Sequence, residues 1–132
     1  MLERYAPDSV RKVPQEYRDI YIHGTQISSP ERLVCLSGQI GIGSDGSVGR
    51  SFKAQCEQAM DNVEALLAEA GMSNSDILRV TYFLTEQENI AELSQIRKTR
   101  WRSETPPAVT TLVVKALAAA DLLVEIEVTA AT

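Results

Sequence analysis

Two carboxylates share one face of a strand-like segment near the C-terminal end of the sequence. Residues 122–129 read Leu-Leu-Val-Glu-Ile-Glu-Val-Thr, and apolar residues recur at every second position. In a β-strand, the even-numbered residues then form an apolar face that fits a core, whereas Glu125 and Glu127 lie on the opposite face. That second face is solvated, or paired with cations, or part of a site in which a carboxylate transfers a proton.

The only histidine of the chain, His23, lies within a strand-like run. A Ser-His-Asp triad or a metal site would have to be built on this residue, and no second ligand lies at a suitable spacing. We therefore predict no metal site. We interpret His23 as a strand residue on a polar face, and a place in the lining of a cleft is the alternative.

A glycine-rich segment, residues 41–46, reads Gly-Ile-Gly-Ser-Asp-Gly and formally matches the fingerprint of dinucleotide-binding loops. Such a site also needs a helix that starts at the third glycine and an acidic residue at the end of the next strand. The helical pattern starts later here, at Ser51. We interpret the segment as a loop at the mouth of a cleft, with a tight turn at Asp45 and Gly46.

The length and composition are those of one globular domain that spans residues 1–132. The net charge of −5 argues against a nucleic-acid-binding protein, because phosphate contacts need a basic surface. No apolar run is long enough to span a bilayer, and the first residues lack the apolar core of a signal peptide. We therefore expect a cytoplasmic protein that binds neither membranes nor nucleic acids.

Two further sets of residues are expected to be structural. Cys35 and Cys56 stand in apolar surroundings, and we expect two buried free thiols rather than a disulfide. A basic cluster lies at the end of the second predicted helix and consists of Arg97, Lys98, Arg100 and Arg102. We interpret this cluster as a solvated surface whose charge favours the C-terminus of the helix.

Helices are predicted over residues 51–70 and 89–102, because apolar residues recur there at spacings of three and four. Ser51 suits the N-cap of the first helix, and Gly71 suits the left-handed position after its end. The second helix carries a stripe formed by Ile90, Leu93, Arg97 and Trp101.

Strands are predicted over residues 19–27, 32–37 and 76–85 and over two segments after Pro107. The first two strands are expected to form a hairpin. The preceding residues 1–18 are expected to pack loosely over the domain.

The predicted strands gather in one layer and the helices in another, which indicates an α+β two-layer sandwich with a mixed sheet and both helices on one face. If the two C-terminal strands are neighbours, the uncovered face is half apolar, with Val109, Thr111 and Val113 beside Leu123, Glu125 and Glu127. Self-association is the simplest cover for such a face.

Four regions of the chain resemble the RidA/YjgF family, the reactive imine or enamine deaminases once labelled L-PSP endoribonucleases. Residues 36–41 read Leu-Ser-Gly-Gln-Ile-Gly and are similar to the family's Ser-Gly-Gln strand end. Residues 58–71, with Asn62-Val63 and a closing Ala-Gly, resemble its first helix. Residues 76–84 resemble its middle strand, and Pro-Pro-Ala-Val at 106–109 and Val-Glu-Ile-Glu at 124–127 resemble its last two strands.

The resemblance implies a chorismate-mutase-like homotrimer with active sites in clefts between adjacent subunits. Members of the family hydrolyse 2-imino acids or their enamine tautomers to 2-keto acids and ammonia, without a metal or organic cofactor. The residue types suit this chemistry. A carboxylate can position a water molecule and carry its proton to the departing nitrogen, and an arginine can bind the substrate carboxylate in a bidentate pair.

The resemblance assigns roles to five residues of this chain by position. Glu125 matches the family's catalytic acid. Tyr21 matches the aromatic residue that lines the cleft, and Ser37 and Gly38 match the strand end beside the substrate. Ser94 matches, in a looser register, the helical asparagine at the border of the cleft.

The chain departs from the family pattern at Val109 and Thr111, which stand where the family has its substrate-binding arginine and a cysteine. A valine cannot bind a carboxylate, and this loss should weaken the binding of small 2-imino acids by about two orders of magnitude or more. Two interpretations remain. Either the protein hydrolyses a larger or less anionic imine or enamine, or it is a non-catalytic trimer whose cleft binds a ligand in a protective or regulatory role. The sequence leaves Lys115, Arg79 and Arg18 as unranked replacements for the arginine.

Overall fold

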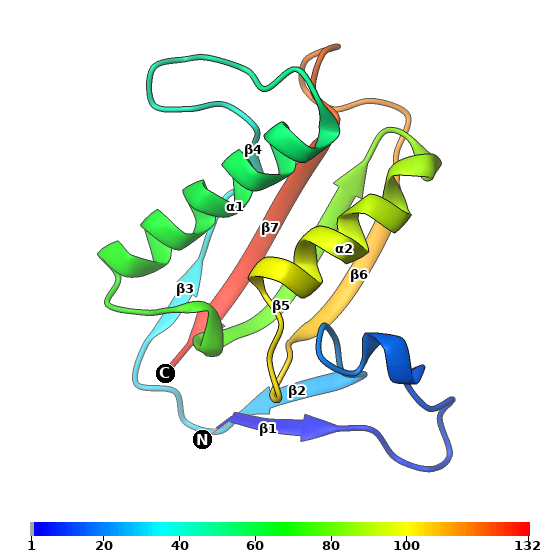
Figure 1. Cartoon of the computed structure of the whole chain (residues 1–132). Coiled ribbons are helices and arrows are strands. Elements are labelled where there is room, and N and C mark those ends of the chain that lie inside the picture. The colour runs from blue at the N-terminus through cyan, green and yellow to red at the C-terminus, as the bar shows by residue number, and fades with distance from the viewer. Residues whose placement is uncertain (1) are drawn as a thin grey trace.

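The computed structural model describes residues 2–132 and shows a two-layer α+β fold in which both helices of this range cover the same face of a sheet (Figure 1). The helices are α1 (Phe52–Glu69) and α2 (Ile90–Arg100). The larger sheet contains β3 (Leu33–Cys35), β4 (Gln39–Ile40), β5 (Ile77–Leu84), β6 (Ala108–Val113) and β7 (Val124–Ala131). A smaller sheet pairs β1 (Leu2–Tyr5) with β2 (Gly24–Ile27). Short 3-10 helices lie at η1 (Gln15–Tyr17), η2 (Asn74–Asp76) and η3 (Gln87–Asn89). The predicted fold class is confirmed.

The larger sheet has the strand order β3-β7-β5-β6, and β4 also pairs with β7. β7 runs antiparallel to β3, β4 and β5, whereas β5 and β6 are parallel, so the sheet is mixed as predicted. The condition that the two C-terminal strands are neighbours is not met, because β5 lies between them. A parallel pair needs a crossover connection, and α2 provides it between β5 and β6.

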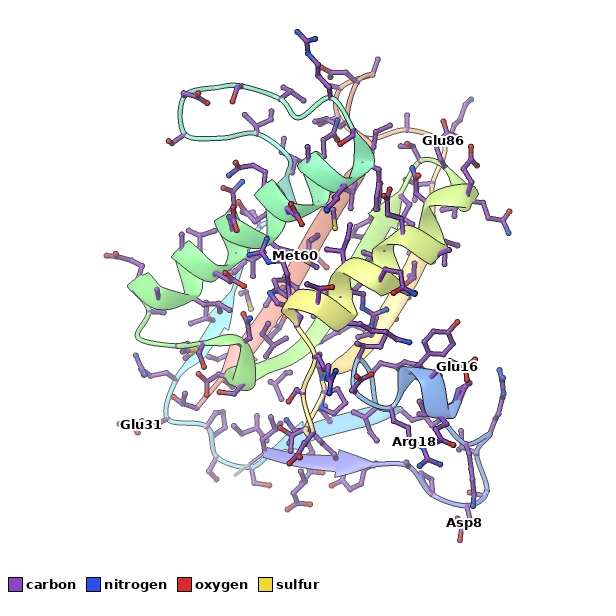
Figure 2. All side chains as sticks on the ribbon, in the orientation of Figure 1. Asp8, Glu16, Arg18, Glu31, Met60 and Glu86 are labelled. Carbon is purple, nitrogen blue, oxygen red and sulfur yellow. The ribbon has the colours of Figure 1, made fainter. Side chains whose placement is uncertain are left out.

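The core lies between the sheet and the two helices. The even-numbered residues of β7, together with Val80, Tyr82 and Leu84 of β5, are buried against the helices. The apolar face of α1 packs on them, and its Met60 is 0% exposed (Figure 2). The strict alternation of residues 122–129 therefore reflects one buried and one uncovered face of β7.

Both predicted ends of the first helix are confirmed. The backbone N–H of Ala54 donates to the Ser51 hydroxyl over 3.1 Å, which makes Ser51 the N-cap of α1. Gly71 has a φ of +71°, the left-handed conformation that lets the chain leave the helix without a Cβ clash.

The hairpin predicted between residues 19–27 and 32–37 is wrong. β2 begins only at Gly24 and pairs with β1, whereas β3 pairs with β7. The backbone of Ile22 instead donates to the carbonyl of Pro107, next to the start of β6. An alternating pattern indicates a strand without specifying its partner, and in this chain residues 2–5 supply the partner of β2.

The small sheet is attached to the larger sheet at the N-terminal ends of β5 and β6. The Thr25 hydroxyl donates to the carbonyl of Leu78 over 2.8 Å, and Arg4 Nε donates to the carbonyl of Pro106 over 3.0 Å. The segment before residue 18, which was expected to pack loosely, thus contains β1 and η1 (Figure 1), and Figure 2 places Asp8 at the outer edge of its loop. This attachment holds the N-terminal segment near one end of α2.

The two cysteines are free thiols, as predicted, but they differ in exposure. Cys56 is buried beneath α1, whereas Cys35 is exposed. The predicted burial of Cys35 is wrong because β3 is an edge strand, and Cys35 pairs with Thr129 on the face that the helices leave uncovered.

Burial raises the pKa of the Cys56 thiol from 9.0 to about 12. We expect Cys56 in a Cys35→Ser variant not to react with a disulfide reagent at mildly alkaline pH while folded, and to react fully in concentrated guanidinium chloride. Since the folded-state pKa is the higher one, this thiol stabilises the fold below the unfolded value, and that contribution is lost as pH rises toward about 12. Rapid modification of the folded variant would contradict this assignment.

Candidate functional site

The residues predicted to form the site lie on two different faces of the larger sheet. Thr111 pairs with Tyr82, whose side chain is buried on the helix side, so Thr111 faces the helices together with Val109. Glu125 pairs with Phe83, one position further along β5, and therefore faces the uncovered side. Because the sheet separates the two groups, they cannot line one cleft within a single copy of the chain.

Glu125 lies in an otherwise apolar row across the uncovered face of the sheet. Its register neighbours are Ile40 of β4 and Phe83 of β5, and Leu112 of β6 follows Phe83 in the same row. Glu125 is half-buried, and it takes part in none of the ion pairs found within residues 2–132. A carboxylate in an apolar setting without a cation of its own is suited to proton transfer.

Ser37 and Gly38 lie in a bulge next to Glu125. The register with β7 shifts by one residue between Cys35 and Gln39, so the edge segment carries one extra residue there. A methyl group on Gly38 would clash with Oε2 of Glu125. The glycine is thus needed to leave room for this carboxylate, while Ser37 is exposed beside it.

The other predicted residues meet in a cavity of about 430 Å³ between α2, β6 and the N-terminal segment. We call it the α2 cavity, and its lining consists of Arg11, Pro14, Tyr17, Tyr21, Ile90, Ser94, Arg97, Val109 and Thr111. The structure therefore brings Tyr21, Ser94, Val109 and Thr111 together. The volume suits a small organic molecule.

Two arginines of the α2 cavity were not predicted to belong to a site. The interpretation of Arg97 as part of a solvated basic cluster is wrong, because Arg97 is only 6% exposed. Its position on the same helical stripe as Leu93 and Trp101 was the one available sequence signal. Arg11 lies in the N-terminal segment, where no sequence pattern indicated a functional residue.

The other three members of the basic cluster make contacts of their own, and Lys98 Nζ lies 5.4 Å from the centre of the Tyr17 ring. Arg100 pairs with Asp61 over 2.6 Å and with Glu64 over 3.1 Å, so it joins α2 to α1. Arg102 pairs with Asp19 over 3.3 Å at the surface. Of the four basic residues, Arg97 is the one that lines the α2 cavity.

His23 lies outside the α2 cavity. It is exposed, and its Nε2 lies 2.5 Å from the carbonyl oxygen of Arg11. It lines a second cavity of about 430 Å³ beneath the N-terminal segment, with Arg4, Lys12 and Arg18 among its neighbours. Within residues 2–132 no group of three His, Cys, Asp or Glu side chains could hold a metal ion.

The glycine-rich loop packs against α1. A methyl group on Gly41 would lie 2.5 Å from Gln55 Cα, which leaves no room for a phosphate group between loop and helix at this point. The predicted turn is confirmed, since Gly46 has a φ of +84° and Asp45 accepts hydrogen bonds from Ser47. None of the helices described is long and apolar enough to cross a membrane.

Comparison with known proteins places this chain among relatives of similar length. Residues 18–132 match the profile of a family described as endoribonuclease L-PSP. A RutC family protein from Aquifex aeolicus is 37% identical over 97 residues, which cover 72% of this chain and 77% of the relative. A protein named 2-iminobutanoate/2-iminopropanoate deaminase, from Salmonella typhimurium, is 31% identical over 75 residues, or 56% of each chain.

Solved structures share the whole fold. A Rid family protein of unknown function from Yersinia pestis superimposes with a TM-score of 0.83 over 99% of this chain and 98% of its own, at 24% identity. The family match at residues 18–132 includes Glu125 and the cavity residues from Tyr21 onward. Arg11 and Tyr17 precede the matched range.

Proposed function

Since the chain belongs to the endoribonuclease L-PSP family, which includes the RidA/YjgF proteins, we propose that it hydrolyses a reactive imine or enamine to a carbonyl compound and ammonia. The reaction takes place in a cleft between two subunits of a homotrimer. One subunit contributes Glu125 from the uncovered face of its sheet, and its neighbour contributes the α2 cavity.

The observation that carries this proposal is the separation of the two groups of residues. Among residues 2–132, Glu125 has an apolar row around it and pairs with no cation, while the lining of the α2 cavity contains polar groups and no carboxylate. Each half lacks what the other supplies. Contact between the uncovered face of one copy and the cavity of the next completes a site in each interface of a cyclic trimer.

In the proposed reaction, Glu125 accepts a proton from a water molecule while the water oxygen attacks the imine carbon. Glu125 then gives this proton to the nitrogen, which completes a tetrahedral carbinolamine. Glu125 next takes the hydroxyl proton of this intermediate and delivers it to the amino group, so that the carbon–nitrogen bond breaks. Ammonia leaves and a carbonyl group remains. One carboxylate thus acts first as the base and then as the acid, which is efficient when it is held within hydrogen-bond reach of both atoms.

The residues around the cavity define what the substrate meets. Tyr21 supplies an aromatic wall, and Ser94 and Thr111 supply hydroxyl groups. Val109 offers no charge on the strand side, so we propose a substrate other than the small 2-imino acids. A non-catalytic trimer that binds a ligand in the same cleft is the alternative function.

Ammonia release from a panel of imines and enamines, generated in situ, tests the proposed function. The panel should run from 2-iminobutanoate to imines with branched and aromatic side chains. Turnover of any member above the uncatalysed rate supports a deaminase. Ligand-induced thermal stabilisation without turnover across the panel would favour the binding function instead.

The proposed homotrimer predicts the mass of the protein in solution. Sedimentation equilibrium should give a mass three times the 14.5 kDa of the chain. Leu112 is 44% exposed on the uncovered face, and replacing it with lysine places a charge in the proposed interface and should shift the protein toward monomers. A wild-type mass of 14.5 kDa would contradict the composite site.

Substitution of Gly38 should reduce turnover without unfolding the protein. In a Gly38→Ala variant the new methyl group displaces the Glu125 carboxylate, and a displacement of this kind costs about a hundredfold in rate. The free energy of unfolding should change by less than about 2 kcal/mol, because the displaced group can rotate away. Gly24→Ala is the matched control, since its methyl group meets Tyr5 Cβ at an ordinary 3.4 Å. Equal turnover in both variants would remove Gly38 from the site.

A further inference from the structure

Arg97 is a buried cation that no carboxylate among the described residues neutralises. The side chain is 6% exposed, and it belongs to none of the ion pairs found within residues 2–132. A buried charge is costly unless an opposite charge and hydrogen bonds compensate it. The arrangement therefore favours an anionic partner from outside the chain.

Two contacts hold the guanidinium group in place. Its Nη2 donates to the carbonyl of Ile20 over 2.7 Å, and its Cζ lies 4.9 Å from the centre of the Tyr82 ring. These contacts fix the plane of the group, and they cannot occupy all five of its N–H donors. The same residue borders the α2 cavity, so its remaining donors can serve a ligand there.

The other walls of the α2 cavity indicate what kind of anion fits. Arg11 adds a second cation from the N-terminal segment, and no aspartate or glutamate lines the cavity. Much of the remaining lining is aromatic or aliphatic, with Tyr17, Tyr21 and Ile90 among it. A ligand with a carboxylate at one end and an apolar body matches this lining, because a planar guanidinium binds a carboxylate bidentately.

We propose that Arg97, assisted by Arg11, binds the carboxylate of an organic acid in the α2 cavity. This inference rests on the proposed function for the identity of the ligand as a substrate, whereas the binding of the anion itself does not depend on turnover. The positive charge of the α2 cavity comes from Arg97 of α2 and Arg11 of the N-terminal segment. The strand side of the cavity is uncharged, since Val109 lies there. The carboxylate lies at this wall, and the apolar body of the ligand extends along the aromatic residues.

Calorimetric titration of the full-length protein with 4-methyl-2-oxopentanoate tests the proposal. The neutral probe is 4-methylpentan-2-one, in which a methyl group replaces the carboxylate. We expect the acid to bind the wild type at least tenfold more tightly than the ketone. Arg97→Met should remove this preference, since it keeps an unbranched apolar stem and deletes the charged guanidinium group, and Arg97→Lys should restore part of it.

Two further variants separate anion binding from a merely structural role of Arg97. Lys53→Met deletes an exposed cation of α1 and should leave the preference for the acid unchanged. The double variant Arg97→Met, Val109→Arg moves the charge to the opposite wall and should recover tighter binding of the acid. A structural role predicts instead that both probes weaken equally in Arg97→Met and that the double variant recovers nothing, which would overturn the proposal.

The proposal and the proposed function fail in different ways. Wild-type turnover of an imine that Arg97→Met leaves unchanged would overturn the role of Arg97 and keep the deaminase. Selective binding of the acid that Arg97→Met abolishes, without turnover of any imine, would support Arg97 as the anion-binding residue and overturn the deaminase.

Discussion

A Glu125→Gln variant is expected to lose imine-hydrolysing activity by a factor of about 10²–10⁴, the usual contribution of a general acid–base group. The amide keeps the size of the side chain but can no longer accept a proton from water. Since Glu125 forms no ion pair within residues 2–132, its neutralisation should change the free energy of unfolding by less than about 0.5 kcal/mol. Steady-state ammonia release and chemical denaturation measure the two effects.

Glu127→Gln is the matched control, because Glu127 lies two residues further along the same face of β7 and is exposed. Its activity should equal that of the wild type. If Glu125→Gln retained full turnover, or if both variants lost it to the same extent, Glu125 would not be the proton-transfer group.

The second large effect is expected at Gln55, whose buried side chain joins three separate segments of the chain. Its Nε2 donates to the carbonyls of Gly49 and Asp121, each over 2.9 Å, and its Oε1 accepts the N–H of Leu123 over 2.8 Å. The side chain is 2% exposed. Gln55→Leu keeps the volume and leaves these three backbone groups without their partner, so unfolding should become easier by about 3–5 kcal/mol.

Chemical denaturation measures this loss. The control is Gln95→Leu on α2, where the side chain is exposed, and a change of less than about 0.5 kcal/mol is expected there. A Gln55→Leu variant as stable as the wild type would show that the glycine-rich loop and the segment before β7 are held by other contacts.

The parts of the fold that could be predicted from the sequence are those with a local cause. The helix α1 follows from the spacing of its apolar residues and from its caps at Ser51 and Gly71, all of which lie within a few turns. The alternation in β7 likewise depends on neighbours two positions apart. Strand partners depend on contacts far apart in the sequence. The pattern therefore predicts a hairpin of residues 19–27 with 32–37, whereas β2 pairs with β1, and it leaves open that β6 pairs with β5.

The residues of the site likewise divide into those that the sequence could indicate and those that depend on contacts far apart in the sequence. Resemblance to a family indicated Tyr21, Ser94, Val109 and Thr111, and the structure brings these four residues to one cavity. It could not indicate that Glu125 lies on the other side of the sheet, because the face of a residue follows from the register of β5 with both of its neighbours. The burial of Arg97 could not be predicted, because a cation at the end of a helix normally faces solvent, and only the packing on Tyr82 and Ile20 places it inside.

The central claim is that one subunit supplies Glu125 and the next supplies the α2 cavity. Mixing two inactive variants tests it most directly. Glu125→Gln removes the acid, and Ser94→Trp fills the cavity from the surface of α2 while the acid remains. Each variant alone should be inactive toward an imine that the wild type hydrolyses.

After subunit exchange at equal concentrations, interfaces that combine an intact Glu125 with an intact cavity should form in about one quarter of the contacts of a cyclic trimer. We therefore predict that the mixture recovers about one quarter of the wild-type rate of ammonia release. A mixture of verified mixed trimers that stays as inactive as its two parents would contradict the composite site.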